Sequence, residues 1–388
     1  MMKYRKDKHG NHLSVLGLGC MRFKDFAETE RMILRAIDAG VNFFDTAFVY
    51  PNSEETLGEI LSKNDKRGDI YISTKLPIGM CNSYDDFDRF FNEQLERLQT
   101  DYIDYYFMHN ITSFSQWEKL VDLGIKKWID EKRTVGKIKQ VGFSFHGIYS
   151  DFLKLIDIYD WEFCMIQYNY YDPHYQAGEA GLKAAAAKGI PVFIMEPLLG
   201  GRLATGLPKA GVEAFSKLDP TKHPAEWAFW WLWNQEEITM TLSGMNTVEM
   251  LEQNVRSATE FRPLTNTELA VYDEVRGIFR KSYKFPCTGC NYCLPCPQNI
   301  NIPACLSAYN TSFAQKYYTG MAMYATTTAM LTKSVRNCNG CGKCEKVCPQ
   351  NIEIRKALKK VARRMEPAPV RLGFKITRKM MRRFFVRK

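Results

Sequence analysis

Short apolar runs alternate with amphipathic stretches from about residue 13 to residue 258. The apolar runs are rich in β-branched and aromatic residues, which predicts strands. They are Leu13–Gly19, Val41–Thr46, Ile70–Lys75, Tyr102–His109, Ile138–Ser144, Phe163–Asn169, Pro191–Pro197 and Thr239–Gly244. The stretches between them have helical spacing: Glu28–Ala39, Ser53–Ser62, Tyr84–Leu98, Gln116–Glu131, Gly178–Ala187 and Val248–Ser257.

Regular strand–helix alternation predicts a parallel sheet, and eight units suit a closed (β/α)8 TIM barrel. An open doubly wound sheet usually carries a glycine-rich nucleotide loop, GxGxxG, and the chain has none. We predict a barrel over residues 1–262 and a connecting helix in 263–284, which includes Thr265–Lys281. A small, mainly α-helical ferredoxin-like domain is predicted over 285–360. Its helices are expected near Pro303–Tyr309 and Phe313–Lys333. Residues 361–388 are predicted as a basic tail.

Eight of the twelve cysteines form two runs near the C-terminus. Each run spaces its cysteines by about three residues and ends before a proline, which is typical of [4Fe–4S] ligation, with the fourth cysteine serving the other cluster. The prediction is two clusters, the first on Cys287, Cys290, Cys293 and Cys348, the second on Cys338, Cys341, Cys344 and Cys296.

Two other interpretations of these cysteines fit less well. Zinc sites use two separated CxxC pairs, and a disulfide framework requires an oxidising compartment. The first run closes as C-x2-C, not C-x3-C, so Cys296 departs from the usual pattern. Cys305 follows closely and is an alternative ligand, although a buried free thiol is the preferred interpretation.

The net charge of +10 belongs to one end of the chain. Residues 355–388 hold fourteen Lys or Arg and one acid, Glu366, so the remainder carries about −3. The tail could be solvated, or could contact an anionic surface through Phe374–Val386, where apolar and basic residues alternate at helical spacing. No apolar run reaches ~18 residues and no secretory leader is evident, so reduced thiols favour the cytoplasm. We predict no specific nucleic-acid partner.

Polar residues gather where the predicted strands end, the face on which barrel enzymes build their sites. Five ordered motifs carry these residues: Gly17–Met21, Gly40–Tyr50, Ser73–Lys75, Tyr105–His109 and Gly142–Ser144. In these motifs the chain resembles the aldo/keto reductase family. The resemblance implies a catalytic tetrad of Asp45, Tyr50, Lys75 and His109.

The chemistry of carbonyl reduction explains these residue types. A phenol with a pKa near ~10 is a poor acid at neutral pH, and a nearby ammonium lowers that pKa. Tyr50 is therefore expected to donate the proton, with Lys75 tuning it and Asp45 holding Lys75. His109 would orient the carbonyl oxygen. Phe23, Phe48, Asn110 and His146 flank these residues and suggest an aromatic-lined substrate pocket.

The resemblance also implies nucleotide contacts, which match less completely. They are expected at Gly19, Met21, Ser144, Gln167, Pro197, Leu198, Gly201, Ser243, Gly244, Gln253 and Asn254. Met165 and Met195 stand where the family has glutamine and tyrosine, and Gly244 and Met250 replace the basic residues that hold a 2′-phosphate. The cofactor is expected to be NADP or NAD, with a flavin as the alternative.

Hydride transfer moves two electrons, whereas a [4Fe–4S] cluster moves one. The leading hypothesis is therefore an iron–sulfur oxidoreductase that interconverts a small-molecule carbonyl and an alcohol, with clusters connected to a ferredoxin-like electron-transfer partner. The alternative is a nucleotide-binding redox sensor or regulatory protein with little turnover. A third hypothesis makes the clusters structural. The sequence identifies no substrate.

Overall fold

The computed structural model describes residues 1–388 except residues 24, 327–332, 369 and 372–388. The chain forms two compact units. The first contains residues 1–198 and 225–265, and the second contains residues 199–224 and 266–388. The proposed tail helix Phe374–Val386 lies outside the described residues. Within the described ones, no helix has both the length and the apolar character needed to cross a membrane.

Eight parallel strands close into a barrel in the first unit, which confirms the predicted fold class. In chain order they are β3 (Leu16–Gly19), β4 (Phe43–Asp45), β5 (Tyr71–Leu76), β6 (Ile103–Ile111), β7 (Ile138–Phe145), β8 (Phe163–Gln167), β9 (Val192–Met195) and β10 (Ile238–Ser243). Strand β10 pairs with β3 and closes the barrel. A hairpin of β1 (Tyr4–Lys6) and β2 (His12–Ser14) precedes it.

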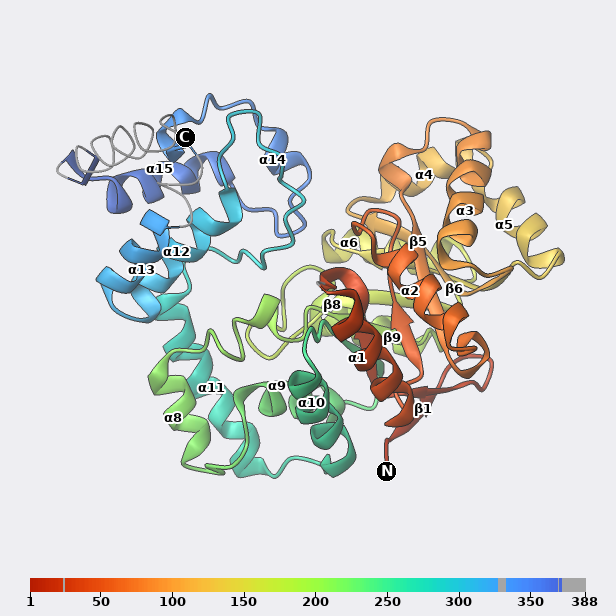
Figure 1. The fold of residues 1–388 in the computed structure, drawn as a ribbon, viewed down its shortest axis with the longest axis horizontal. Coiled ribbons are helices and arrows are strands. Elements are labelled where there is room, and N and C mark those ends of the chain that lie inside the picture. Colours follow the sequence, from red (N-terminus) through yellow and green to blue (C-terminus); the bar gives the residue numbers. More distant parts are fainter. Residues whose placement is uncertain (24, 327–332, 369, 372–388) are drawn as a thin grey trace. The chain divides into compact units, whose positions relative to one another are not determined.

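Helices lie outside the barrel strands (Figure 1). They are α1 (Phe26–Asp38), α2 (Ser53–Lys63), α3 (Tyr84–Leu98), α4 (Phe114–Asp122), α5 (Ile125–Thr134), α6 (Tyr149–Ile158), α7 (Gly178–Ala187), α9 (Pro224–Trp233) and α10 (Val248–Glu260). Polar side chains cap the starts of α1, α3 and α10. Asp25, for example, accepts a hydrogen bond from the Glu28 backbone N–H at 2.9 Å.

The predicted helix Gln116–Glu131 is two helices, α4 and α5. Gly124 lies between them with φ of +92°, a conformation that L side chains rarely adopt. The chain therefore turns at Gly124, and the amphipathic pattern continues across a break that periodicity alone does not reveal. Helix α6, which the sequence analysis did not predict, completes the unit between β7 and β8.

Aromatic and aliphatic side chains fill the barrel interior. The cluster comprises Leu13, Phe43, Tyr105, Phe107, Phe163, Met165, Phe193, Met240 and Leu242. The rings of Phe163 and Phe193 stack with centroids 5.3 Å apart. Tyr105 donates its hydroxyl hydrogen to Asp7 at 2.6 Å, which links the N-terminal hairpin to the barrel strands. The barrel is a packed core, and this core supports the strand ends that carry the polar residues.

The second unit is mainly helical. It contains α8 (Lys209–Ser216), α11 (Asn266–Ser282), α12 (Ile302–Ala314), α13 (Tyr317–Tyr324), α14 (Lys343–Lys346) and α15 (Ile354–Met365). Helix α8 packs against α11, so residues 199–224 group with this unit and not with the barrel in which the sequence analysis placed them. The predicted helix Phe313–Lys333 contains α13, but its start is wrong, because Phe313 and Ala314 end α12; residues 327–332 of this range lie outside the described residues.

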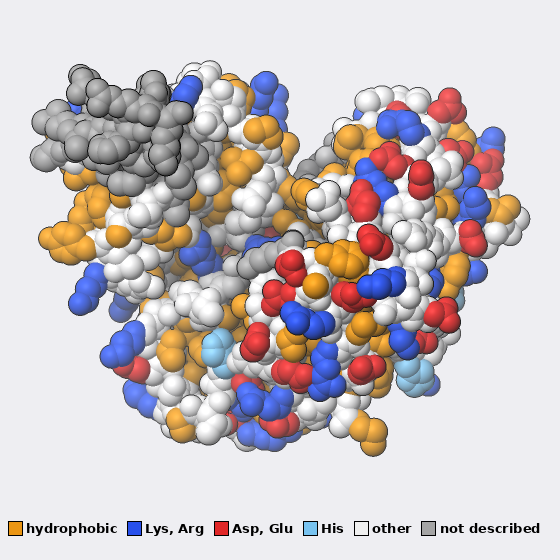
Figure 2. All heavy atoms as spheres, in the orientation of Figure 1, with side chains coloured by type: hydrophobic (Ala, Val, Ile, Leu, Met, Phe, Trp, Pro, Cys, Tyr) orange, Lys and Arg blue, Asp and Glu red, His pale blue; other side chains and the backbone are white. Residues whose placement is uncertain are grey.

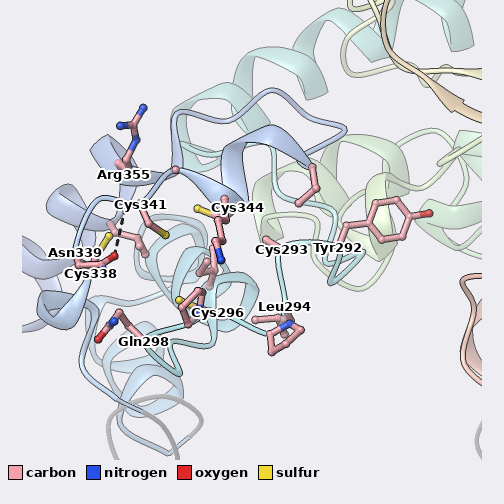
Figure 3. Close-up of a pocket in the computed structure, with 17 residues that line it drawn as sticks. Tyr292, Cys293, Leu294, Cys296, Gln298, Cys338, Asn339, Cys341, Cys344 and Arg355 are labelled. Carbon is pink, nitrogen blue, oxygen red and sulfur yellow. Dashed lines mark hydrogen bonds between the residues drawn. The ribbon is translucent and has the colours of Figure 1, made fainter. Parts of the chain in front are cut away.

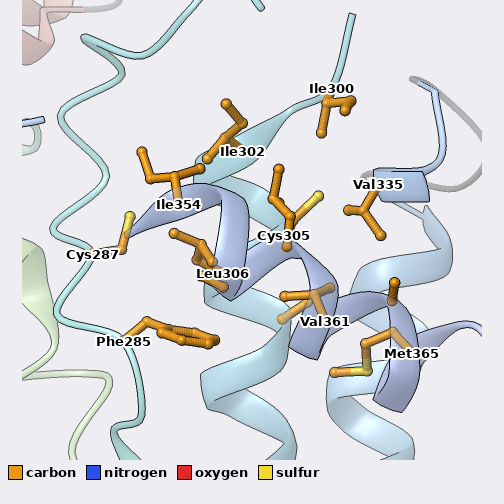
Figure 4. Packing of buried hydrophobic residues seen from close by; sticks show 14 of the residues in the cluster. Phe285, Cys287, Ile300, Ile302, Cys305, Leu306, Val335, Ile354, Val361 and Met365 are labelled. Atoms are coloured by element: carbon orange, nitrogen blue, oxygen red, sulfur yellow. The ribbon is translucent and has the colours of Figure 1, made fainter. Parts of the chain in front are cut away.

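A second hydrophobic core lies between α12 and α15 (Figure 4). Leu306, Val361 and Met365 are almost wholly buried in it. Residues 361–365, predicted as the start of a tail, therefore belong to a packed helix. A polar network supports the core, since buried Glu366 accepts hydrogen bonds from the Tyr324 hydroxyl at 2.5 Å and the Ser334 hydroxyl at 2.7 Å.

Candidate active site and cluster sites

Four polar residues converge at the carboxyl ends of β4, β5 and β6. Asp45 ends β4, Lys75 lies in β5 and His109 lies in β6, while Tyr50 follows β4. The Lys75 ammonium donates to Asp45 Oδ1 at 2.6 Å and lies 5.1 Å from the centroid of the Tyr50 ring. The Tyr50 and His109 rings meet edge to face with centroids 6.0 Å apart. The structure thus brings all four residues into one cluster.

Burial determines the charge states in this cluster. Lys75 is 2 % exposed, and burial lowers its pKa below 10.5 although the neighbouring Asp45 carboxylate opposes that shift. Burial also holds the pKa of His109 well below its usual value, with further contributions from Lys75 and His146. His109 is consequently a neutral imidazole at neutral pH, so one ring nitrogen carries a hydrogen and the other accepts one.

Neighbouring side chains hold the ion pair in place. Ser73 donates its hydroxyl hydrogen to Asp45 Oδ1 at 2.7 Å, and Lys75 also donates to the Thr46 carbonyl at 2.5 Å. Asp45 and Ser73 lie opposite each other in the neighbouring strands β4 and β5, so strand pairing fixes their separation. The Lys75 ammonium therefore has two short acceptor contacts, to Asp45 and to Thr46, and little freedom to move.

A buried polar network that the sequence pattern did not predict lies behind Lys75. Glu54, which is fully buried, accepts hydrogen bonds from Thr74 at 2.5 Å and from Gln94 at 2.8 Å, and it pairs with Arg97 at 3.1 Å. Gln94 also donates to the Lys75 carbonyl at 3.1 Å. Strand alternation places Thr74 on the face opposite Lys75, so a polar Thr74 in a buried strand was the one available signal.

The positions expected to contact the nicotinamide include two polar side chains, Ser144 and Gln167, and one apolar side chain, Met165. Ser144 is buried and accepts a hydrogen bond from the Asn110 backbone at 2.8 Å. Gln167 ends β8 and accepts from Gln176 at 3.2 Å. Met165 lies in the barrel interior, opposite Ser144 in the β7–β8 register. A polar amide is therefore present in β8, two residues beyond the position where the family has glutamine.

The expected contacts to the rest of the nucleotide occupy three places. Gly19 ends β3 and Met21 lies in the following short helix η1 (Cys20–Arg22). Asn254 donates to Ser243 at 3.1 Å, while Gly244 and Met250 are exposed and Gln253 is half-buried. Pro197 and Leu198 follow β9, whereas Gly201 lies in the second unit, in η4 (Leu199–Gly201). The roles of these residues stay predictions.

The eight cysteines group around two pockets, each lined by cysteines of both runs, while their assignment as cluster ligands stays a prediction. Cys287, Cys290, Cys293 and Cys348 line one pocket. Cys296, Cys338, Cys341 and Cys344 line the other, which Cys293 also borders (Figure 3). Burial raises the pKa of Cys293 to about 12, with smaller contributions from Cys287, Cys290 and Cys348. Each run therefore lies beside the last cysteine of the other run.

This donor set fits two cubane clusters. Among the described residues, no three histidine, cysteine or carboxylate side chains converge closely enough to bind one metal ion. A [4Fe–4S] cluster instead takes four separate thiolates around its core, and each pocket is lined by its four predicted ligands, with Cys293 bordering both. Cys305 is fully buried in the hydrophobic core beside Leu306 and Ile300 (Figure 4), which is the environment of the free thiol that we preferred.

Known protein families match both units of the chain. The aldo/keto reductase family profile matches residues 15–276 and that of the 4Fe-4S dicluster domain matches residues 286–353. The chain belongs to the aldo/keto reductase family. An aldo-keto reductase of Mycolicibacterium vanbaalenii is 31 % identical over 204 residues, which span 50 % of this chain and 66 % of that protein.

Other members of the family give the same fold and class. An uncharacterised oxidoreductase of Bacillus subtilis, YqkF, is 24 % identical over 68 % of this chain and 94 % of its own length. A solved holo-form aldo-keto reductase of Bacillus halodurans matches 71 % of this chain and 96 % of its own, with a TM-score of 0.59 and 24 % identity. This aldo/keto reductase is thus an oxidoreductase-family barrel joined to a 4Fe–4S dicluster domain.

Proposed function

We propose that this chain is an iron–sulfur oxidoreductase that interconverts a small-molecule carbonyl and an alcohol at Tyr50. The observation that carries the proposal is the buried Asp45–Lys75 ion pair beside the Tyr50 and His109 rings. A positive charge next to a phenol favours its deprotonated form, so the arrangement turns Tyr50 into a usable acid.

Each member of the cluster has a role that follows from its surroundings. Asp45 offsets the burial of Lys75 and so favours a charged ammonium near the phenol. Tyr50 holds the proton that the product oxygen receives. His109 is neutral, and its one N–H can orient a carbonyl oxygen toward Tyr50, which remains the proton donor. A bound nicotinamide, or alternatively a flavin, would supply the hydride equivalent, with Ser144 and Gln167 as the side chains proposed to hold its ring.

The cysteine pockets add one-electron chemistry to the proposal. The two sets of four cysteines would bind two [4Fe–4S] clusters, which pass single electrons. We propose that they connect the barrel reaction to a ferredoxin-like carrier. Reduced thiols are needed to assemble such clusters, which supports the cytoplasm as the location.

Replacing Tyr50 with Phe tests the assignment, because it removes only the acidic hydroxyl. Carbonyl reduction by the anaerobically purified protein is expected to fall about 100-fold or more, with cluster absorbance unchanged. Tyr149→Phe is the matched control, since Tyr149 lies exposed at the start of α6. Undiminished turnover in Tyr50→Phe would overturn the mechanism. Bound nucleotide without turnover in the unmodified protein would favour the redox-sensor alternative.

A further inference from the structure

Helix α15 has one apolar face and one strongly basic face. Its apolar side chains are buried in the second core: Ile354, Ala357, Leu358, Val361, Ala362 and Met365. Its basic side chains are exposed: Arg355, Lys356, Lys359, Lys360 and Arg363. The helix is therefore held in place by its apolar face, and the cations project from a fixed support.

Three of these cations are not paired with a carboxylate in the described part of the chain. Arg355 pairs with Glu345 at 2.7 Å, and Lys356 pairs with Glu353 at 2.5 Å. Lys359, Lys360 and Arg363 form no ion pair with any residue that the structure describes. On the barrel, by contrast, acidic and basic side chains are interspersed (Figure 2), and many are paired. The face of α15 is thus a local excess of positive charge.

This basic face borders one of the two cysteine pockets. A groove in the second unit is lined by Lys356, Lys359 and Arg363 of α15, by the paired glutamates Glu345 and Glu353, and by Cys338 and Gly340. Cys338 also lines the pocket of Cys296, Cys341 and Cys344. Cys341 is exposed, whereas Cys287 of the other pocket is only 8 % exposed. An electron carrier seated in this groove would approach the pocket of Cys338 and Cys341.

The same helix is poorly suited to a lipid surface. A helix that binds a membrane in the interfacial plane inserts its apolar face among the acyl chains. The apolar face of α15 already packs in the core, and Leu306 lies in the same cluster. The unpaired cations Lys359 and Arg363 line a concave groove, in which the two glutamates, Glu345 and Glu353, are already paired with Arg355 and Lys356. A folded acidic protein fits this surface better than a bilayer does.

We propose that the basic face of α15, with Lys359 and Arg363 at its centre, docks an acidic one-electron carrier protein of the ferredoxin type at the Cys338–Cys341 side of the dicluster domain. This rests on the proposed function, in which the cysteines bind clusters. Each docking event exchanges one electron and no proton between carrier and cluster. In the reducing direction two carriers are each oxidised by one electron, and these two electrons, with one proton from Tyr50 and one from solvent, convert a carbonyl into an alcohol.

The experiment is a binding titration of the anaerobically purified full-length protein with an acidic bacterial 2[4Fe–4S] ferredoxin. The variant is Lys359→Glu with Arg363→Glu. The matched control is Lys217→Glu with Lys281→Glu, which changes the same charge at two exposed positions of the same unit, one directly after α8 and one in α11. Isothermal titration calorimetry at several salt concentrations gives Kd and its salt dependence, neither of which depends on turnover.

The double variant is expected to weaken Kd about tenfold or more at low salt and to reduce the salt dependence, because close charges on a docking surface steer association. The control is expected to bind within about twofold of the unmodified protein. Equal weakening in both would overturn the site, as would unchanged binding in the α15 variant. Retained ferredoxin binding with lost binding to phosphatidylglycerol vesicles would assign the face to membranes and also overturn it.

Failure of docking and failure of the proposed function remain distinguishable. Dithionite reduces clusters without needing a docking surface, so cluster reduction and subsequent carbonyl reduction with dithionite test the proposed function alone. If dithionite supports turnover but the α15 variant binds ferredoxin normally, only the docking proposal fails. If iron and sulfide are absent from the anaerobically purified protein, both fail.

Discussion

The buried ion pair of the barrel offers the sharpest test of the site, through the substitution Asp45→Ala. The Lys75 and Asp45 side chains are 2 % and 7 % exposed and 2.6 Å apart. At an effective dielectric constant of ~20, this distance corresponds to an attraction of about 6 kcal/mol. Removing the carboxylate leaves a buried ammonium with one acceptor, the Thr46 carbonyl.

The expected loss in the free energy of unfolding is smaller than the full attraction. Lys75 can release its proton, and part of the attraction already offsets the cost of burying both charges. Breaking one side of a buried pair typically costs about 3–5 kcal/mol. The double variant Asp45→Ala with Lys75→Met removes both charges and is expected to cost less than Asp45→Ala alone, because no unpaired charge stays buried.

The pH dependence has a definite sign. The pKa of Lys75 in the folded protein lies below 10.5, so the unfolded chain binds more protons between the two values and stability rises with pH there. Asp45→Ala lowers the folded pKa further and widens that range downward. The deficit of Asp45→Ala relative to the unmodified protein is therefore largest near neutral pH and shrinks as the pH rises toward 10.

Tryptophan fluorescence during urea unfolding provides the assay, because all seven tryptophans lie in the barrel unit. The signal therefore follows the barrel and not the dicluster domain. A loss below about 1 kcal/mol for Asp45→Ala, or a double variant less stable than the single one, would contradict the reasoning. The first result would mean that the pair contributes little beyond the surrounding hydrogen bonds, and the second that Lys75 stabilises the barrel even without Asp45.

Three further substitutions test a buried histidine, a predicted cluster ligand and the predicted nucleotide site. Burial lowers the pKa of His146 to about 4, so the contribution of its neutral ring to the free energy of unfolding is present above pH 6.5 and is lost as the pH falls through 4. His146→Gln is expected to remove about 3 kcal/mol of this acid-induced loss, measured by the same fluorescence unfolding. A dependence of stability on pH equal to that of the unmodified protein would argue against it. Cys348→Ser is expected to lower bound iron by about half, because Cys348 shares its pocket with three other predicted ligands of the first cluster. Cys305→Ala is expected to keep the full iron content, since Cys305 is buried in the hydrophobic core. Equal iron loss in both variants would favour Cys305 as a ligand. Met250→Arg places a cation at an exposed position of α10. It is expected to tighten NADPH binding about tenfold and to leave NADH binding unchanged. An equal gain in affinity for both nucleotides would refute the assignment of the 2′-phosphate site.

The amino-acid pattern was sufficient for the eight barrel strands, because a strand buried on both faces is a continuous apolar run whatever its neighbours are. It was sufficient for the two cysteine runs as well, since their spacing is local. It failed at the break at Gly124 and at the end of α12 at Ala314, where helical periodicity continues past the actual terminus. It also failed at residues 199–224, because packing of α8 on α11 is a long-range contact.

By itself, the sequence determined the barrel, the position of the polar residues at its strand ends and the number of thiolates available. Tertiary structure alone decided how those groups interact. Burial lowers the pKa of Lys75 while Asp45 opposes the shift, and the Glu54–Gln94 network that supports β5 joins residues forty positions apart. The exchange of Cys296 and Cys348 between pockets likewise depends on folding. Spacing specifies local geometry, whereas distance, burial and charge arise only when remote segments pack together.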